Sequence, residues 1–175
     1  METDAKQRVN IQYYESPCGK LVLASVGDKL CLCDWSDMPC AERNKRRLAR
    51  LHNVVFEEKT SAVLQEMAAQ LDEYFSGRRK TFSIPLFPVG TDFQKRVWNA
   101  LLEIPYGATR TYSEIARSIG NPKGVRAVAQ AIGVNGLCIV VPCHRVIGKN
   151  NSLTGFAGGL AAKKILLSIE GCVNI

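Results

Sequence analysis

The sequence lacks several features that would place it in a large class of proteins. It contains no apolar run long enough to cross a membrane. Residues 1–6 do not combine a basic start with an apolar stretch, so we expect no secretion signal. The seven cysteines are an odd number, and without such a signal they favour reduced thiols over a disulfide framework. We therefore expect a cytoplasmic protein with no membrane partner.

The cysteines also lack the spacing of a structural metal site, because no pair of them has the Cys-x-x-Cys pattern with two residues in between. A single residue stands between Cys31 and Cys33, which predicts that they share one face of a strand. The candidate ligands for a zinc ion are Cys18, Cys31, Cys33, Cys40 and His52. We interpret the four thiols as core residues and expect no metal, with zinc as the minor alternative.

Acidic residues are scarce in the second half of the chain. The 175 residues carry a formal net charge of +7. Residues 1–90 hold 13 Lys and Arg against 12 Asp and Glu, whereas residues 91–175 hold 10 against 4. Such an excess is typical of a surface that faces a polyanion such as nucleic acid, although a moderately basic half also occurs where charge only aids solubility.

The first half alternates strand-like and helix-like patterns. These are a three-stranded meander at 8–35, a charged helix at 40–52, a short strand at 54–56 and an amphipathic helix at 61–76. Two prolines and a glycine then interrupt the pattern at 85–90. The chain is thus predicted to be α+β, with an antiparallel-sheet domain at 1–88 and a mainly helical domain at 89–175.

Two short helices follow in the second domain. Thr111 and Glu114 form a capping box that predicts the start of the first. Asn121 and Pro122 predict the start of the second, as N-cap and first helical residue, and Gly133 predicts its end. The pair suits a helix-turn-helix that binds DNA, while the alternative is two helices packed through alanines.

The sequence around Cys143 indicates a nucleophile. A strand-like run at 137–141 ends at a proline, and Cys143, His144 and Arg145 follow. A neighbouring imidazole and guanidinium lower the pKa of a thiol and so favour the reactive thiolate. A cysteine–histidine pair also needs a third group to orient the imidazole, and Glu170 is the candidate. The alternative is a buried cysteine that acts as a small apolar residue.

A glycine-rich segment at 155–159 precedes the last predicted helix. Glycines allow a flat ligand to approach the backbone closely. After a reactive cysteine, this segment is predicted to cover a pocket of the size of a nucleobase.

Together these motifs resemble the O6-alkylguanine-DNA alkyltransferase family, also called methylated-DNA–protein-cysteine methyltransferases. The resemblance covers residues 91–175 in order. It rests on Pro142-Cys143-His144-Arg145 with Val146-Ile147-Gly148, on Thr111-Tyr112, on Arg126-Ala127-Val128, on Asn135 and on Gly158-Gly159 with Glu170-Gly171. The first 90 residues match in general layout the ribonuclease-H-like domain of the family, and the second domain its winged helix-turn-helix-like domain.

The resemblance implies direct DNA repair. The family binds duplex DNA from the minor groove, flips the damaged guanine out and moves the alkyl group from O6 to a cysteine. It implies Cys143 as acceptor, His144 as base acting through a water, and Glu170 as the group polarising it. It also implies Tyr112 as donor of a hydrogen bond or a proton to the leaving guanine, and Asn135 as a brace. DNA contacts are expected from Arg126, Ala127, Lys123, Gln130, Thr111 and Arg145. The substrate pocket is expected to include Val146, Phe156, Ala157 and Gly158.

The product is a thioether, so the protein is expected to act once and be consumed, without a cofactor, as a monomer. In a prokaryote we expect it at the nucleoid. Gly136, Cys138, Phe156 and Ala157 depart from residues common in the family, which leaves the accepted alkyl size open. Activity on O4-alkylthymine is also left open. The alternatives are a relative that binds lesions without catalysis, and a cysteine–histidine hydrolase.

Overall fold

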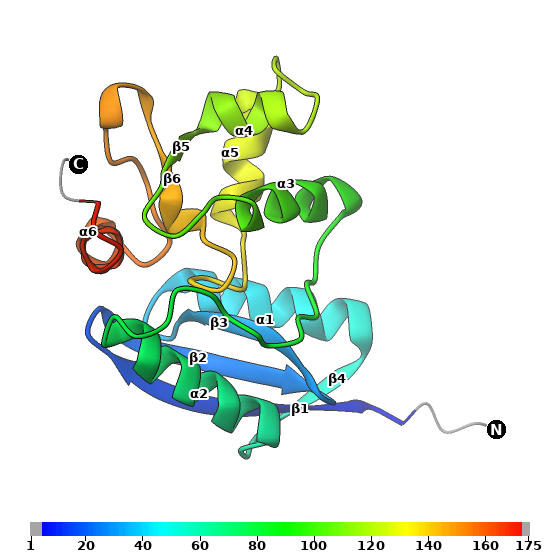
Figure 1. Ribbon diagram of the computed structural model, residues 1–175. Coiled ribbons are helices and arrows are strands. Elements are labelled where there is room, and N and C mark those ends of the chain that lie inside the picture. The colour runs from blue at the N-terminus through cyan, green and yellow to red at the C-terminus, as the bar shows by residue number, and fades with distance from the viewer. Residues whose placement is uncertain (1–4, 173–175) are drawn as a thin grey trace.

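A four-stranded sheet forms the base of the first part of the molecule (Figure 1). The computed structural model describes residues 5–172, except for the side chain of His52. The sheet order is β3-β2-β1-β4. Its strands are β1 (Gln7–Ser16), β2 (Gly19–Val26), β3 (Lys29–Trp35) and β4 (Val54–Glu58). The first three are antiparallel, and β4 runs parallel to β1 after a helical crossover.

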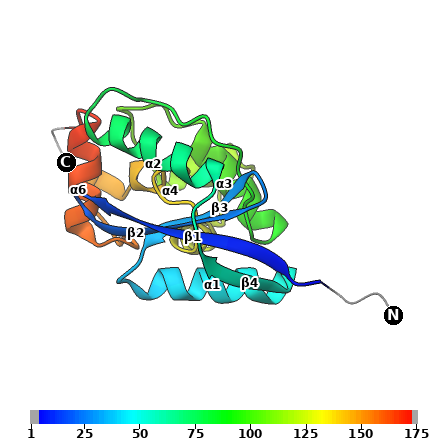
Figure 2. The ribbon, with the colours of Figure 1, turned by 90° about the horizontal axis from the view of Figure 1, so that it is seen from below.

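Two helices cover opposite faces of this sheet (Figure 2). They are α1 (Pro39–His52) and α2 (Ala62–Phe75). One core lies between the sheet and α1 and includes the strand residues Val9 and Val22 with Leu48 of α1. A larger core includes the strand residue Leu21 with Leu64 and Met67 of α2, and it continues into the second part of the chain. The meander and both helices predicted from the sequence are therefore confirmed.

Cys31 and Cys33 do not share a face, which corrects the expectation from their spacing. The pairing of β2 with β3 shifts between Ala24 and Ser25, so Cys31 falls at an irregularity in the strand. A bulge inserts one extra residue and reverses the alternation of side chains beyond it. Cys31 consequently packs in the core beneath α1, and Cys33 in the larger core on the other face.

The second part is mainly helical. Its elements are α3 (Asp92–Leu102), β5 (Arg110–Thr111), α4 (Tyr112–Ser118), α5 (Val125–Gly133), the 3-10 turn η1 (Cys143–Arg145), β6 (Val146–Ile147), the turn η2 (Lys149–Asn151) and α6 (Leu160–Ile169). The short strands β5 and β6 pair in parallel. The α+β class is confirmed. No helix in the described part of the chain is long and apolar enough to cross a membrane.

The first helix of the predicted pair begins as expected, but the second begins later. Thr111 and Glu114 form the capping box at the start of α4. The second helix, α5, starts at Val125 with Gly124 as its N-cap, not at Asn121. Asn121 instead donates its N–H to the Ala116 carbonyl and closes α4. Its side chain then folds against Gly124, where a Cβ atom would collide with it.

Residues 137–141 form a buried loop, so the strand predicted there is wrong. Ile139 has a φ of 73°, in the left-handed region that a strand cannot contain. The loop is held to β3 at two points: Cys33 donates its N–H to the Gly136 carbonyl, and Cys138 donates its N–H to the Cys33 carbonyl, both at 2.8 Å. All five residues are buried, and a buried loop produces the same continuous apolar run as a buried strand.

Candidate active site

Cys143 begins the turn η1 directly after this loop. Asn135 fixes the loop from both sides: its amide nitrogen donates to the Val141 carbonyl at 3.0 Å, and its amide oxygen accepts from the Leu137 N–H at 3.0 Å. Cys143 itself donates its N–H to the Val141 carbonyl at 2.8 Å. The arrangement is that of the expected brace, because Asn135 sets the path of the chain that carries the thiol.

The surroundings of Cys143 favour its thiolate. Its side chain is buried, with 4% of the residue exposed. The thiol of Cys138 and the amide of Asn135, aided by the charge of Lys163, lower the pKa of Cys143, although burial and the charge of Asp34 oppose them. A hydrogen bond to the charged form stabilises that form, which is why the pKa falls in a buried site. Cys143 thus has the character of a nucleophile.

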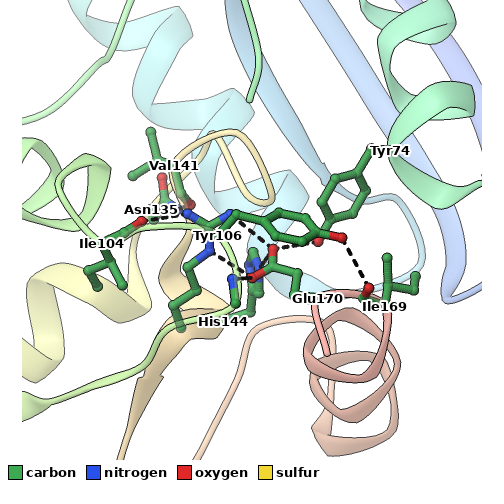
Figure 3. Close-up of polar contacts among 10 residues, drawn as sticks. Tyr74, Ile104, Tyr106, Asn135, Val141, His144, Ile169 and Glu170 are labelled. Atoms are coloured by element: carbon green, nitrogen blue, oxygen red, sulfur yellow. Dashed lines mark hydrogen bonds and ion pairs between the residues drawn. The ribbon is translucent and has the colours of Figure 1, made fainter. Parts of the chain in front are cut away.

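His144 and Glu170 are in contact, as the sequence analysis expected (Figure 3). The His144 Nε2 atom lies 2.7 Å from Glu170 Oε1, and both side chains are fully buried. The turn η1 supplies the histidine and the end of α6 supplies the glutamate. Contact between residues 26 positions apart thus completes the cysteine–histidine pair with an orienting carboxylate.

Glu170 accepts five hydrogen bonds. Its Oε1 accepts from His144, from the Tyr74 hydroxyl at 2.8 Å and from Arg145 Nη2 at 3.0 Å. Its Oε2 accepts from Arg145 Nε at 2.8 Å and from the Gly107 N–H at 3.4 Å. Burial alone would raise the pKa of Glu170, but the hydrogen bonds and charges of His144 and Arg145 lower that pKa to about 2. The carboxylate is therefore ionised at neutral pH.

Arg145 is in the interior, which corrects the expectation that it contacts DNA. Its side chain is 9% exposed and forms the ion pair with Glu170. It also donates to the Ile104 carbonyl at 2.6 Å, and its guanidinium lies 5.9 Å from the ring centre of Tyr106. With its donors directed at these groups, Arg145 neutralises the buried carboxylate.

His144 is neutral and has one free ring nitrogen. Burial lowers the pKa of His144, against the opposing effect of Glu170. An ionised carboxylate only accepts hydrogen bonds, so Nε2 carries the ring proton and Nδ1 carries a lone pair. Within the part of the chain that the structure describes, Nδ1 is one of two buried side-chain polar atoms without a partner. It is therefore available to accept a proton.

The segment expected to cover the substrate pocket rests on the sheet domain. The Phe156 ring meets the Trp35 ring edge-on at 5.1 Å between centroids. A Cβ atom on Gly158 would lie 2.6 Å from the Trp35 ring, so only glycine fits there. The Cys40 sulfur lies 3.8 Å from the Ala157 carbonyl oxygen. Contacts with β3 and α1 thus fix the segment's position.

A buried lysine connects this segment to η1. Lys163, on α6, donates to the carbonyls of Val146 at 2.5 Å and Thr154 at 3.4 Å. Its ammonium lies 5.9 Å from the Phe156 ring centre, and burial lowers its pKa. Thr154 in turn donates to the Tyr112 hydroxyl at 3.1 Å. The expected pocket residue Val146 and proton donor Tyr112 therefore belong to one connected group.

The residues expected to bind DNA, apart from Arg145, lie at the surface or close to it. Lys123, Arg126, Ala127 and Gln130 are exposed along the turn before α5 and on α5, and Thr111 is half-buried at the start of α4. Trp98 donates its indole N–H to the Ala131 carbonyl at 2.8 Å, which anchors the inner face of α5 to α3. The outer face of α5 is consequently free to meet a ligand.

Sequence reasoning missed several residues of this site, namely Trp35, Asp34, Tyr74, Tyr106 and Lys163. The first three belong to the sheet domain, and no local pattern in the sequence distinguishes them from ordinary core or strand residues. Tyr106 donates its hydroxyl to the Ile169 carbonyl at 3.0 Å. The one available signal was Lys163, because a lysine stands among apolar residues of the last helix.

Among the described residues, the thiols considered as zinc ligands do not gather into a metal site. Cys31 and Cys33 lie in different cores, and Cys40 donates to Asp34 Oδ1 at 3.1 Å. Among the described residues, no group of three or more His, Cys, Asp or Glu could hold a metal ion. The side chain of His52, the remaining candidate, lies outside the described residues.

Comparisons with known proteins match nearly the whole chain. The family model described as "6-O-methylguanine DNA methyltransferase, DNA binding domain" matches residues 92–172, and the one described as its "ribonuclease-like domain" matches residues 9–88. A methylated-DNA–protein-cysteine methyltransferase of Methanosarcina acetivorans is 46% identical over 158 residues, covering 90% of this chain and 96% of that protein. The constitutive one of Bacillus subtilis is 46% identical over 169 residues, covering 91% and 96%.

Solved structures agree. The Mycobacterium tuberculosis O6-methylguanine methyltransferase is 39% identical, with a TM-score of 0.80, and covers 94% of this chain and 93% of its own. A structure of the M. tuberculosis protein described as OGT, in complex with DNA, is 39% identical with a TM-score of 0.79 and the same coverage.

Proposed function

The chain belongs to the 6-O-methylguanine DNA methyltransferase family, and from that premise we propose that the sulfur of Cys143 accepts the alkyl group. The protein repairs alkylated DNA directly, by transfer of the alkyl group from guanine O6 to a cysteine of its own. The observation that carries the assignment to Cys143 is its position beside a buried, neutral histidine that an ionised glutamate holds in place.

The first step generates the thiolate. The Cys143 S–H gives its proton to His144 Nδ1 through a water, since that nitrogen has no hydrogen-bond partner among the described residues, and the ionised Glu170 stabilises the imidazolium that forms. Cys138 and Asn135 stabilise the negative sulfur, because both lower the pKa of Cys143. Arg145 keeps Glu170 ionised throughout, since it forms two hydrogen bonds to that carboxylate.

The second step is a single displacement. The sulfur attacks the alkyl carbon, an S–C bond forms, and the bond between that carbon and guanine O6 breaks. The electron pair of the broken bond remains on the guanine, which takes up a proton from the Tyr112 hydroxyl. The product is an S-alkylcysteine and a repaired guanine. A thioether carries no second leaving group, so each chain acts once.

The DNA must present the base outside the stack. A base inside the duplex is out of reach of a side chain, so the reaction requires its extrusion. We assign Arg126 to the space left by the base, because it is exposed on α5. Phe156, Ala157 and Gly158 are assigned to the wall of the base pocket, and Lys123, Ala127, Gln130 and Thr111 to the DNA surface. Since DNA is the substrate, we assign the protein to the cytoplasm and, in a prokaryote, to the nucleoid.

The test is mass spectrometry after mixing the protein with a duplex that holds one O6-methylguanine. We expect one methyl group per chain, on the peptide that contains Cys143, and no further turnover. Cys143→Ala should bind the duplex without gaining mass, whereas the matched control Cys172→Ala should gain one methyl group. Methylation of the Cys143→Ala variant would refute the assignment.

A further inference from the structure

Four arginines of α1 line one groove. Arg43, Arg46, Arg47 and Arg50 recur at the three- and four-residue spacing that places side chains on one helix face. The groove has a volume of about 980 Å³ and is bounded on its other side by the start of α3, through Gly90, Thr91 and Gln94. Its one acidic lining residue is Glu42. The groove is therefore strongly basic, although it belongs to the half of the chain with almost no net charge.

Two of these arginines hold the molecule together, and two are available. Arg43 donates to the Gly133 carbonyl at 3.0 Å, and Arg47 donates to the carbonyls of Val89 and Val134. Arg46 forms a 3.4 Å ion pair with Glu42, but both side chains are more than half exposed, so the pair contributes little. Arg50 is exposed, and within residues 5–172 no hydrogen bond or ion pair holds it.

The groove continues onto the helix that is assigned to DNA. A neighbouring groove of about 540 Å³ shares Arg43, Thr91 and Gln94 with the first, and its other wall includes Ala127 and Gln130 of α5. The bond from Arg43 to Gly133 places α1 at the end of α5. One surface thus runs from the outer face of α5 to Arg50.

We propose that the arginine face of α1 binds the phosphate backbone of the duplex that flanks the damaged base. The inference rests on the proposed function, since it requires α5 to be seated on DNA. Duplex DNA is the partner that matches a mainly basic surface continuous with α5, because guanidinium groups bind phosphates in bidentate geometry. The two available arginines, Arg46 and Arg50, are four residues apart, about 6 Å along the helix, which corresponds to roughly two base-pair steps.

The test compares the salt dependence of binding for two charge-matched variants. Arg46→Gln/Arg50→Gln removes the two available groups and leaves the structural arginines in place. Arg8→Gln/Arg78→Gln removes the same charge from β1 and from the chain after α2. Each variant is titrated with an alkylated duplex of about 30 base pairs and with one of about 10, roughly one helical turn. Melting temperatures confirm that both variants are folded.

On the long duplex we expect the slope of log K against log salt to become about 1.8 less steep for Arg46→Gln/Arg50→Gln, since each phosphate contact contributes about 0.9. When the salt concentration rises from 50 to 200 mM, the fold-loss of affinity of this variant should be about twelve times smaller than the fold-loss of the wild-type protein. On the short duplex the two variants should bind alike, and both should transfer the methyl group normally.

Equal slopes for the two variants on the long duplex would overturn the proposal. An equal loss on both duplexes would also overturn it, because the contact would then lie within the lesion site. Loss of cooperativity with an unchanged slope would indicate a second copy of the chain in place of DNA. The proposed function fails separately, if the wild-type protein binds the duplex but gains no methyl group on Cys143.

Discussion

Replacement of Glu170 by glutamine tests the centre of the site. Glutamine has nearly the same shape but no charge, so it leaves the Arg145 guanidinium buried without a counter-ion. Its amide nitrogen must also face hydrogen-bond donors, either those on the His144 side or those on the Gly107 side of the carboxylate. Removal of one partner from a buried ion pair costs about 3–5 kcal/mol. The change is large beside a total stability of about 5–15 kcal/mol.

The lowered pKa of Glu170 gives a second value for the contribution of this carboxylate to stability. A pKa of about 2, against 4.5 for the free side chain, corresponds to about 3 kcal/mol of stability. Because the folded-state pKa is lowered, this contribution is fully present above pH 4.5 and disappears as the pH falls toward 2. The two approaches agree on a loss of about 3 kcal/mol at neutral pH.

The assay is urea unfolding at several pH values between 7 and 2. We expect Glu170→Gln to unfold at a lower urea concentration at pH 7, and the difference from the wild-type protein to shrink as the pH falls below 4.5. The rate of methyl transfer should fall by about 10²–10⁴, because the variant no longer positions a general base.

Glu42→Gln is the matched control, since Glu42 forms an exposed pair with Arg46. It should change stability by less than about 1 kcal/mol. The reasoning fails if Glu170→Gln is no more destabilising than Glu42→Gln at pH 7, or if the stability difference persists unchanged at pH 2.

Three further substitutions test other contacts. Cys138→Ala removes the thiol that lowers the pKa of Cys143, so the pH at which Cys143 reacts half-maximally with iodoacetamide should rise. Arg126→Ala should slow repair of a duplex while transfer from free O6-benzylguanine stays unchanged, because only the duplex requires base extrusion. Gly158→Ala forces a methyl group against the Trp35 ring, so unfolding should show a loss of about 1–3 kcal/mol, with slower transfer.

Each of these has an opposite result that would count against it. An unchanged or lower midpoint for Cys138→Ala would remove that thiol from the site. An equal loss on duplex and free base would give Arg126 a role in folding or chemistry instead of extrusion. Gly155→Ala is the control for Gly158→Ala, because a Cβ atom there meets nothing within 4 Å. Equal effects of the two would contradict the contact with Trp35.

Local patterns in the sequence were enough to predict most helices and strands. The capping box of Thr111 and Glu114 and the amphipathic helix α2 were found because their signals lie within a few neighbouring residues. Two predictions failed where distant contacts decide the backbone. The apolar run 137–141 is a loop because β3 binds its backbone, and the bulge at Cys31 depends on pairing with β2.

In the site, too, local motifs pointed to the right residues, whereas the directions of their side chains depended on distant contacts. The resemblance identified Cys143, His144 and Glu170, and the structure brings the last two into contact. The same motif led to an expectation of DNA contact for Arg145, although the side chain points inward to Glu170. Adjacent residues in a turn point in different directions, so proximity in sequence does not assign a side chain to the surface.

The sequence by itself determined the α+β class, the adjacency of Cys143 and His144, and the excess of positive charge in the second half. These features depend on residue type and short spacing, which the chain carries before it folds. Only the tertiary structure decided that Tyr74 donates to Glu170 from 96 positions away, that Trp35 supports the pocket segment, and that the α1 arginines continue the surface of α5. The pKa values and the shape of the surface depend on burial and on contacts between remote segments. Burial and such contacts arise only when the two halves of the chain pack together.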